Sequence, residues 1–305
     1  MIAKPLKRAA LRTTRRILSG DERRFIRWHD RLDRGRAADR ATDGLEGDAA
    51  RVLIDLRRDG FARWPGVFAD PAFLDDARVS ADEILDRARR SLSEAPPGGR
   101  AHDERSSAEF WKGSNPQDGR TRANFDAKQR DGVPDALSGV FDHGPLASVV
   151  RGYYGIDSVW CGALLVEELA GSKTADAWHF DKLFDQVKVM ILLEDATEEQ
   201  GPLRYKLGTH RRPPELDFLF HRSFKGGPHD GLCYNYPPMP LVDKLGGEVA
   251  LGTGRAGDAI VFDTLGVHSG SICWSGRRLA LVMSFNARTA KNDAIYELFF
   301  PERAA

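Results

Sequence analysis

Residues 178–197 read WHFDKLFDQVKVMILLEDAT, and this stretch decides the fold. Its apolar part, VKVMILL at 187–193, is one of four short apolar runs beyond residue 156. The other three are SVWCGALLV at 158–166, AIVF at 259–262 and LALVMSF at 279–285. Short runs rich in Val, Ile, Leu and Phe, bounded by Gly, Pro, Asp or Thr, are typical of buried strands. The second half of the chain is therefore predicted to form a sheet.

The first half has a helical pattern instead. Gly60 is a helix stop signal, and Asp70-Pro71 is a typical pair for the start of a helix. The predicted elements are helices at 49–59, from 71 to about 92, at 134–141 and at 145–154, and a strand at 61–64. Helices first and strands later predict an α+β fold, with helices packed on one side of a mostly antiparallel sheet.

Two segments show no regular pattern. Residues 93–132 contain PPGG, isolated aromatics and seven acidic and seven basic residues, and 211–240 is rich in Gly and Pro. Long irregular segments inside a compact domain are often functional loops. We expect both segments to form substrate or lid loops, and their mixed charge favours a polar or zwitterionic small molecule as substrate.

The composition excludes several classes of protein. The chain has 305 residues with 41% hydrophobic residues, which is too apolar for a disordered or collagen-like chain. Three widely spaced cysteines fit neither a disulfide framework nor a zinc pattern, and they favour a reducing cytoplasm. No stretch approaches the roughly 18 apolar residues that span a bilayer. A cytoplasmic protein without a transmembrane segment is expected.

The 45 basic and 45 acidic residues cancel, but residues 1–36 alone contain twelve basic and four acidic residues. Apolar residues spaced by three, four and seven predict basic amphipathic helices there. This arm either makes a weak contact with an anionic surface or a protein, or packs on the main domain. Nucleic acid is not an expected partner, because aromatic residues do not alternate with the basic ones. We expect the arm at 1–48 and one domain at 49–305.

His179 and Asp181 stand two residues apart, so both point to one face if the backbone is extended. Two histidines and one carboxylate with open positions suit Fe(II), and His268, between the strand AIVFDT and SGS, is the best candidate for the third ligand. Alone, a His-x-Asp pair is a weak signal, because a histidine that is hydrogen-bonded to an aspartate gives the same pattern.

An ordered series of motifs strengthens the metal-site interpretation. It comprises WHFD at 178–181, LLEDAT at 192–197, EQGPLRYKLGTH at 199–210, GDAIVFD at 257–263, His268, and RRLAL at 277–281. The series resembles the phytanoyl-CoA dioxygenase family of Fe(II)- and 2-oxoglutarate-dependent oxygenases over roughly residues 156–288, and DGFARWPGVF resembles the start of the same domain. The resemblance implies a double-stranded β-helix, or jelly-roll, with a cupin-like core.

Carried onto this sequence, the resemblance implies that His179, Asp181 and His268 bind Fe(II). Arg278 stands where the family's arginine binds the distal carboxylate of 2-oxoglutarate, and a planar guanidinium suits that task. The adjacent Arg277 is the alternative, because neighbours on a strand face opposite sides. The turn after His268 departs from the family pattern, which leaves the choice between the two arginines open.

Three further residues are candidates for binding the co-substrate. Thr264 and Ser269 flank His268 and either contact 2-oxoglutarate or serve an ordinary turn. Lys188 either faces the pocket and binds a carboxylate or faces solvent.

The resemblance implies that O2 and 2-oxoglutarate are consumed, that succinate and CO2 are released, and that a small molecule is oxidised. Asp181 fills the position that a halide would need, so hydroxylation of an unactivated C–H bond is expected rather than halogenation. Two alternatives stay open: a catalytically inactive jelly-roll that is a binding or scaffold module, and a cupin-like metal-dependent hydrolase or isomerase.

Overall fold

The computed structural model describes residues 45–103, 105, 108–112, 120–126, 133–155, 158–171, 177–181, 185–211, 242, 243, 245, 247–288 and 292. The predicted helices of the basic arm, in 1–36, lie outside the described residues. Of the loop predicted at 211–240, only Arg211 is described. No helix in the described part of the chain is long and apolar enough to cross a membrane.

The helices lie close to their predicted positions. They are α3 (Gly47–Asp59), α4 (Pro71–Ser91), α5 (Asp135–Ser138), the 3-10 helix η2 (Gly139–Asp142) and α6 (Gly144–Tyr154). Asp70 caps α4, since its side chain accepts a hydrogen bond from the backbone N–H of Ala72. Gly60 ends α3 in the left-handed region, at a φ of 75°. The predicted start and stop signals therefore act as expected.

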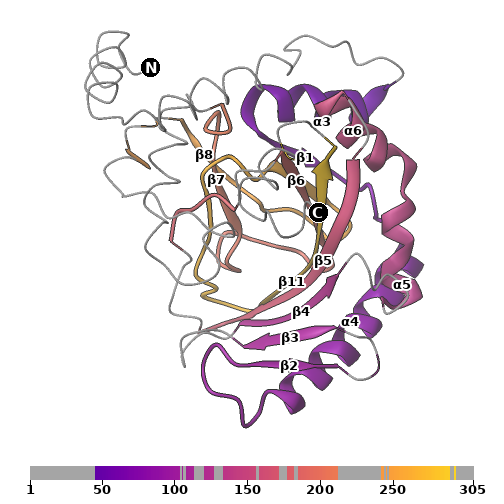
Figure 1. The fold of residues 1–305 in the computed structure, drawn as a ribbon, viewed down its shortest axis with the longest axis vertical. Helices are drawn as coiled ribbons and strands as arrows, with labels where there is room; N and C mark the ends of the chain where they lie inside the picture. The colour runs from indigo at the N-terminus through magenta and orange to yellow at the C-terminus, as the bar shows by residue number, and fades with distance from the viewer. Residues whose placement is uncertain are drawn as a thin grey trace, which may run out of the picture.

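Two antiparallel sheets form the centre of the molecule (Figure 1). The larger sheet has the order β1-β9-β6-β11-β5-β4-β3-β2, and the smaller one has the order β10-β7-β8. The strands are β1 (Phe61–Trp64), β2 (Arg100–His102), β3 (Glu109–Lys112), β4 (Arg120–Asp126), β5 (Ser158–Leu169), β6 (Gln186–Leu192), β7 (Leu203–Lys206), β8 (Val249–Leu251), β9 (Ala259–Asp263), β10 (His268–Gly270) and β11 (Arg277–Ala287). Two facing antiparallel sheets confirm the predicted jelly-roll.

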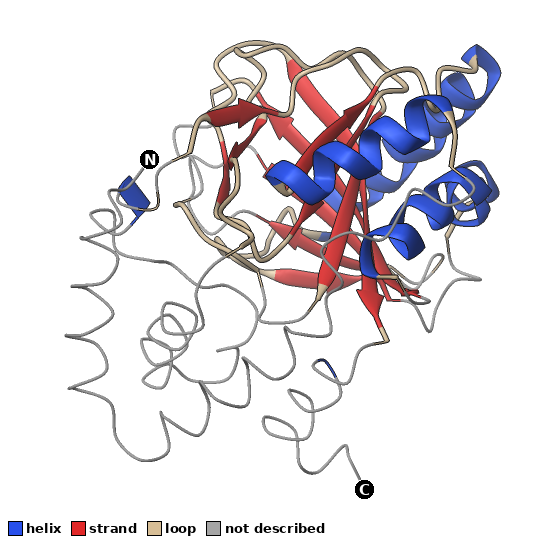
Figure 2. Cartoon of the chain, turned by 90° about the horizontal axis from the view of Figure 1, so that it is seen from above, coloured by secondary structure: helices blue, strands red, loops and turns tan. Residues whose placement is uncertain are grey.

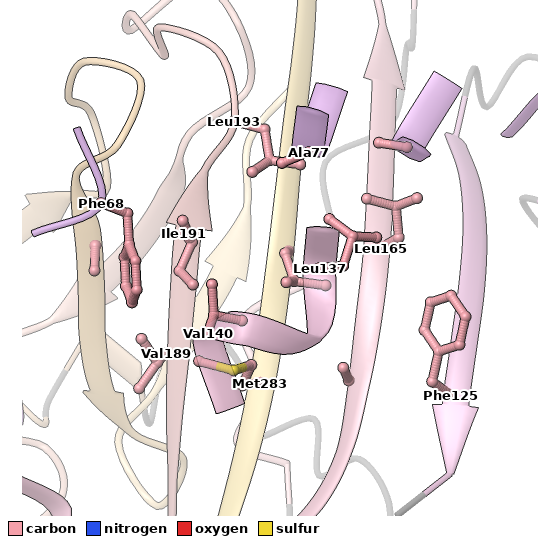
Figure 3. Close-up of a cluster of buried hydrophobic side chains, with 14 of the residues drawn as sticks. Phe68, Ala77, Phe125, Leu137, Val140, Leu165, Val189, Ile191, Leu193 and Met283 are labelled. Carbon is pink, nitrogen blue, oxygen red and sulfur yellow. The ribbon is translucent and has the colours of Figure 1, made fainter. Parts of the chain in front are cut away.

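The helices cover one face of the larger sheet (Figure 2), as the sequence predicted. Alternate residues of β6, such as Val189 and Ile191, point to this side and pack in the main apolar core. In Figure 3, Met283 of β11 lies beside Val140 of η2 in this core, and Leu137 of α5 lies close by. Helix packing therefore fixes the larger sheet from outside and leaves its other face to the site.

The inner face of the larger sheet packs against the smaller sheet. Met190 and Leu192, the intervening residues of β6, form a second apolar cluster with Tyr205 of β7 and Phe262 of β9. The strict alternation along β6 thus supplies two separate cores. The candidate site lies beside the second one, between the sheets.

The prediction of an irregular segment at 93–132 was wrong for β2, β3 and β4, which extend the larger sheet there. Strand β4 has the sequence RTRANFD, in which only Ala123 and Phe125 are buried apolar residues. The inner face of β4 carries Arg120, Arg122 and Asn124, which pair in register with β5. The strand prediction depended on continuous apolar runs. Because every second residue of β4 is polar, β4 contains no such run and was not predicted.

Candidate metal centre

His179 and His268 face each other across an isolated antiparallel bridge. The backbone N–H of His179 donates to the carbonyl of His268 over 2.8 Å, and that of His268 donates to His179 over 2.7 Å. Residues paired in this way point their side chains to the same face, and the centroids of the two imidazole rings are 4.5 Å apart. The backbone alone therefore brings the two predicted histidine ligands together.

Asp181 follows His179 by two residues, and its backbone N–H donates to the carbonyl of Thr264 over 3.1 Å. Its Oδ1 lies 3.6 Å from Nε2 of His179 and 3.5 Å from Nε2 of His268. One potential ligand atom from each of the three residues lies within 4.8 Å of the others, and all three side chains are buried. Among the described residues these three form a group that could hold a metal ion.

The environment of the two imidazole rings fits a metal. Nδ1 of His179 lies 2.8 Å from the carbonyl of Ala177, and Nδ1 of His268 lies 2.8 Å from the carbonyl of Gly266. A carbonyl oxygen can only accept, so Nδ1 carries the proton in both rings and the lone pair of Nε2 faces the centre. Asp181 Oδ1 is also buried, and it accepts no hydrogen bond from the described residues.

The protonation states support the same conclusion. Burial alone would raise the pKa of Asp181, but its neighbours, of which the Lys188 ammonium has the largest effect, outweigh burial and hold that pKa well below its usual range. Burial lowers the pKa of His268, against the opposing effect of the Asp181 carboxylate. A charged carboxylate and a neutral imidazole are the forms that bind a divalent metal.

Aromatic side chains hold the His268 ring in place. The Tyr205 ring stacks on it at 6.3 Å and 12°, and the Phe262 ring meets it edge-on at 5.2 Å. The Tyr205 hydroxyl donates to the carbonyl of Asp263 over 3.0 Å, so this large buried side chain is itself fixed. Packing and hydrogen bonding therefore leave the ring little freedom.

The two adjacent arginines of β11 face opposite sides of the larger sheet. Arg277 points to the helix side, where it donates to Asp82 of α4 over 2.7 Å and to Glu194 over 3.0 Å. Arg278 points to the inner face, is 5% exposed, and pairs with Glu168. Of the two, only Arg278 lies on the face of the larger sheet that is turned toward the smaller sheet and the candidate metal-binding residues.

Arg278 belongs to a buried row of charges that runs across three neighbouring strands. Arg120 of β4 and Arg278 of β11 are each in register with Glu168 of β5, and each lies 2.7 Å from one of its carboxylate oxygens. Nε of Arg278 is buried and has no hydrogen-bond partner among the residues that the structure describes. The guanidinium is therefore partly held by the protein, and one buried donor still lacks an acceptor.

The three other predicted residues have different neighbours. The Thr264 hydroxyl donates to the carbonyl of Gln186 over 3.2 Å, and the Ser269 hydroxyl accepts from Nε of Arg204 over 3.0 Å. Ser269 adjoins His268 on β10, so alternation points its side chain to the opposite face of the smaller sheet. Lys188 forms an ion pair with Asp181.

The sequence interpretation missed Glu168 and Arg120. Both are charged residues at positions where a buried strand usually carries apolar ones, and each is less than 5% exposed. The signal that could have revealed them is Glu167-Glu168 at the end of the apolar run of β5. One of two adjacent carboxylates on a strand must face inward, where burial demands a cationic partner.

Comparisons with known proteins agree with this geometry. The family model for phytanoyl-CoA dioxygenase (PhyH) matches residues 56–275. The chain therefore belongs to the phytanoyl-CoA dioxygenase family, as its motifs indicated. No curated protein matches the chain in a sequence search.

Three solved structures illustrate the likeness of the fold. SnoK, described as a non-heme alpha ketoglutarate dependent carbocyclase from nogalamycin biosynthesis, is 15% identical, with a TM-score of 0.56 over 81% of this chain and 86% of its own. The epimerase SnoN, in complex with Fe3+ and alpha ketoglutarate, is 17% identical, with a TM-score of 0.53 over 78% and 83%. EctD from S. alaskensis, with bound Fe, is 16% identical, with a TM-score of 0.55 over 78% and 76%. At such identities the likeness concerns the fold.

Proposed function

We propose that this protein is an Fe(II)- and 2-oxoglutarate-dependent dioxygenase that hydroxylates an unactivated C–H bond of a small polar molecule. The observation that carries the proposal is the buried group His179, Asp181 and His268, with both Nε2 atoms and Oδ1 facing one point. When bound, Fe(II) supplies the redox chemistry: O2 and 2-oxoglutarate are consumed, succinate and CO2 are released, and one oxygen atom enters the C–H bond.

The residues of this chain have separate tasks in that reaction. His179, Asp181 and His268 would hold the metal with three protein ligands, and such a set would leave positions for the co-substrate and O2. Arg278 binds the distal carboxylate of 2-oxoglutarate, since its unpartnered Nε is buried on the same face of the sheet as the site. The inner face excludes bulk water through Met190, Phe262 and their apolar neighbours.

A polar substrate agrees with the inner face of β4. Arg122 and Asn124 lie there, and the Arg122 guanidinium stacks over the Trp111 ring at 4.7 Å from its centroid. Free Cys273 suits a reducing compartment such as the cytoplasm. Because SnoK and SnoN are described as a carbocyclase and an epimerase, product analysis must also cover ring closure and inversion.

The binding of Fe(II) and 2-oxoglutarate can be tested without a substrate. Fe(II) and 2-oxoglutarate added under anaerobic conditions are expected to give a metal-to-ligand charge-transfer band in the visible spectrum. His179→Ala removes one of the three ligands and is expected to abolish the band. If the wild-type protein gives no band, or the variant gives the same band, the proposal is wrong.

Turnover separates this function from its two rivals. An inactive scaffold does not convert 2-oxoglutarate to succinate, and a cupin-like hydrolase or isomerase has no use for it. Succinate formation that depends on Fe(II) and on Arg278 is therefore expected only for the oxygenase. Metal analysis of anaerobically purified protein measures independently which metal the protein binds, and iron is the expected result.

A further inference from the structure

Lys188 lies on β6 at the edge of the candidate metal centre. It is in register with Ser284 of β11 and Phe262 of β9, and its neighbours Val187 and Val189 point to the helix side. Its side chain therefore points to the inner face, where its ammonium group pairs with Oδ2 of Asp181. Lys188 thus binds a carboxylate, but in this structure the carboxylate is the protein's own.

The two oxygens of Asp181 have different neighbours. Oδ1 lies within 3.6 Å of Nε2 of both histidines, whereas Oδ2 is held by Lys188. A carboxylate can bind a metal ion through one oxygen or through both. If Asp181 used both oxygens, the second would fill a position that the two-histidine, one-carboxylate arrangement leaves open.

We propose that Lys188 is a positioning residue that holds Oδ2 of Asp181, so that only Oδ1 reaches the metal. This inference rests on the proposed function, because it concerns the metal bound by the same three ligands. The metal positions that the three protein ligands do not fill then stay available to 2-oxoglutarate and O2. Lys188 need not touch the substrate or the co-substrate for this effect.

The burial of Asp181 indicates that Lys188 stays paired with this carboxylate when a ligand binds, rather than leaving it to pair with the ligand. Asp181 is 3% exposed, and a buried carboxylate that loses a cationic partner bears a large desolvation cost. A bound metal would compensate Oδ1, but Oδ2 would still need a donor. Lys188, whose side chain is 21% exposed, is the ion-pair partner already in contact with that oxygen.

The number of water molecules on a bound metal tests the proposal directly. Mn(II) is loaded into wild-type protein and into Lys188→Met, and the relaxation of water protons is measured in the absence of 2-oxoglutarate. In the variant, Oδ2 is free to bind the metal and displaces one water. The inner-sphere relaxivity is expected to fall by roughly a third, which is one water of about three at such a site.

Two affinities give a second readout. In Lys188→Met, Mn(II) is expected to bind at least as tightly as in the wild type, because a ligand oxygen is gained and a nearby cation is lost. The affinity of the Mn(II)-loaded variant for 2-oxoglutarate is expected to fall tenfold or more, because one of its positions is filled. A residue that only supported the fold would weaken both affinities together.

Two control variants accompany these measurements. Lys188→Arg keeps a cation beside Oδ2 and is expected to retain the wild-type relaxivity. Lys112→Met removes a lysine of β3 that donates to the carbonyls of Leu92 and Ala95, and it is expected to change neither affinity. If Lys188→Met does not fold, Lys188→Gln is measured in the same way.

The proposal is overturned if Lys188→Met has the wild-type relaxivity. It is also overturned if a folded Lys188→Met protein loses affinity for both Mn(II) and 2-oxoglutarate. A wild-type protein that fails to bind Mn(II) and 2-oxoglutarate contradicts the proposed function instead. If the wild-type protein binds Mn(II) and 2-oxoglutarate, and Lys188→Met has the same relaxivity and affinities, only the proposed role of Lys188 is contradicted.

Discussion

At the scale of single residues, the two arginines of β11 show how one step along a strand changes the chemistry available to a side chain. Arg277 lies among carboxylates on the helix side, and glutamate Glu194 raises its pKa further. Arg278 lies inside, where it pairs with Glu168 and its Nε has no partner in the described part of the chain. Arg278 therefore has a donor on the inner face of the larger sheet that is available to a ligand.

Substitution of each arginine separates these two environments. Arg278→Gln is expected to weaken 2-oxoglutarate binding to the Mn(II)-loaded protein by about a hundredfold, which corresponds to about 3 kcal/mol for a lost charge-assisted bond. Arg277→Gln is expected to leave that affinity within about twofold and to lower the melting temperature instead. Titration calorimetry and thermal unfolding measure both effects. Equal loss of affinity in the two variants would contradict the assignment.

The residues also show how far sequence reasoning reaches. His179, Asp181 and His268 were predicted because an i, i+2 spacing and an ordered motif series are local signals. The contact of Glu168 with Arg278 depends on the register of two strands that are distant in the sequence. Ser269 adjoins a predicted ligand, yet alternation turns it to the other face and toward Arg204. The sequence thus predicted the three residues that the structure brings together, but not the charged groups that surround them.

At the scale of elements, β4, β5 and β11 are joined by side chains as well as by backbone hydrogen bonds. Arg120, Glu168 and Arg278 form one row across the three strands, and all are nearly inaccessible to solvent. Both arginines contact the carboxylate of Glu168, which compensates buried positive charge. The row therefore ties β4, which the sequence did not reveal as a strand, to the strand that carries Arg278.

Neutralising Glu168 tests the importance of this row. Glu168→Gln is expected to lower the free energy of unfolding by about 3 kcal/mol, because it removes the negative charge that two buried guanidinium groups contact. The matched control is Glu109→Gln, in the exposed pair of Arg100 and Glu109, with an expected change below about 1 kcal/mol. Urea denaturation monitored by circular dichroism measures both. Similar changes in the two variants would show that the buried row contributes no more than a surface pair.

At the scale of the whole molecule, the metal-binding residues and both apolar cores lie between Val52 and Phe285. The basic excess of residues 1–36 lies before all of them. The balanced total charge is therefore the sum of a basic segment and an acidic catalytic region. We infer that metal binding does not depend on the basic segment.

Deletion of residues 1–36 tests this separation. The truncated protein is expected to bind Mn(II) and 2-oxoglutarate with wild-type affinity, because every proposed ligand, and every contact described above for it, lies outside residues 1–36. Sedimentation and vesicle binding are expected to reveal any effect on self-association or on attachment to anionic surfaces. A folded truncation that no longer binds 2-oxoglutarate would show that the two parts are coupled.

The bridge between His179 and His268 has a consequence for how the protein acquires its metal. These residues are 89 positions apart in the sequence, and two reciprocal backbone hydrogen bonds close the loop between them. Closing a long loop costs conformational entropy, and here backbone hydrogen bonds help to offset that cost. In metal-dependent mini-domains, by contrast, binding energy drives folding itself. We therefore expect the free energy of metal binding to contribute to affinity rather than to drive folding, so that removal of the metal with a chelator leaves the protein folded.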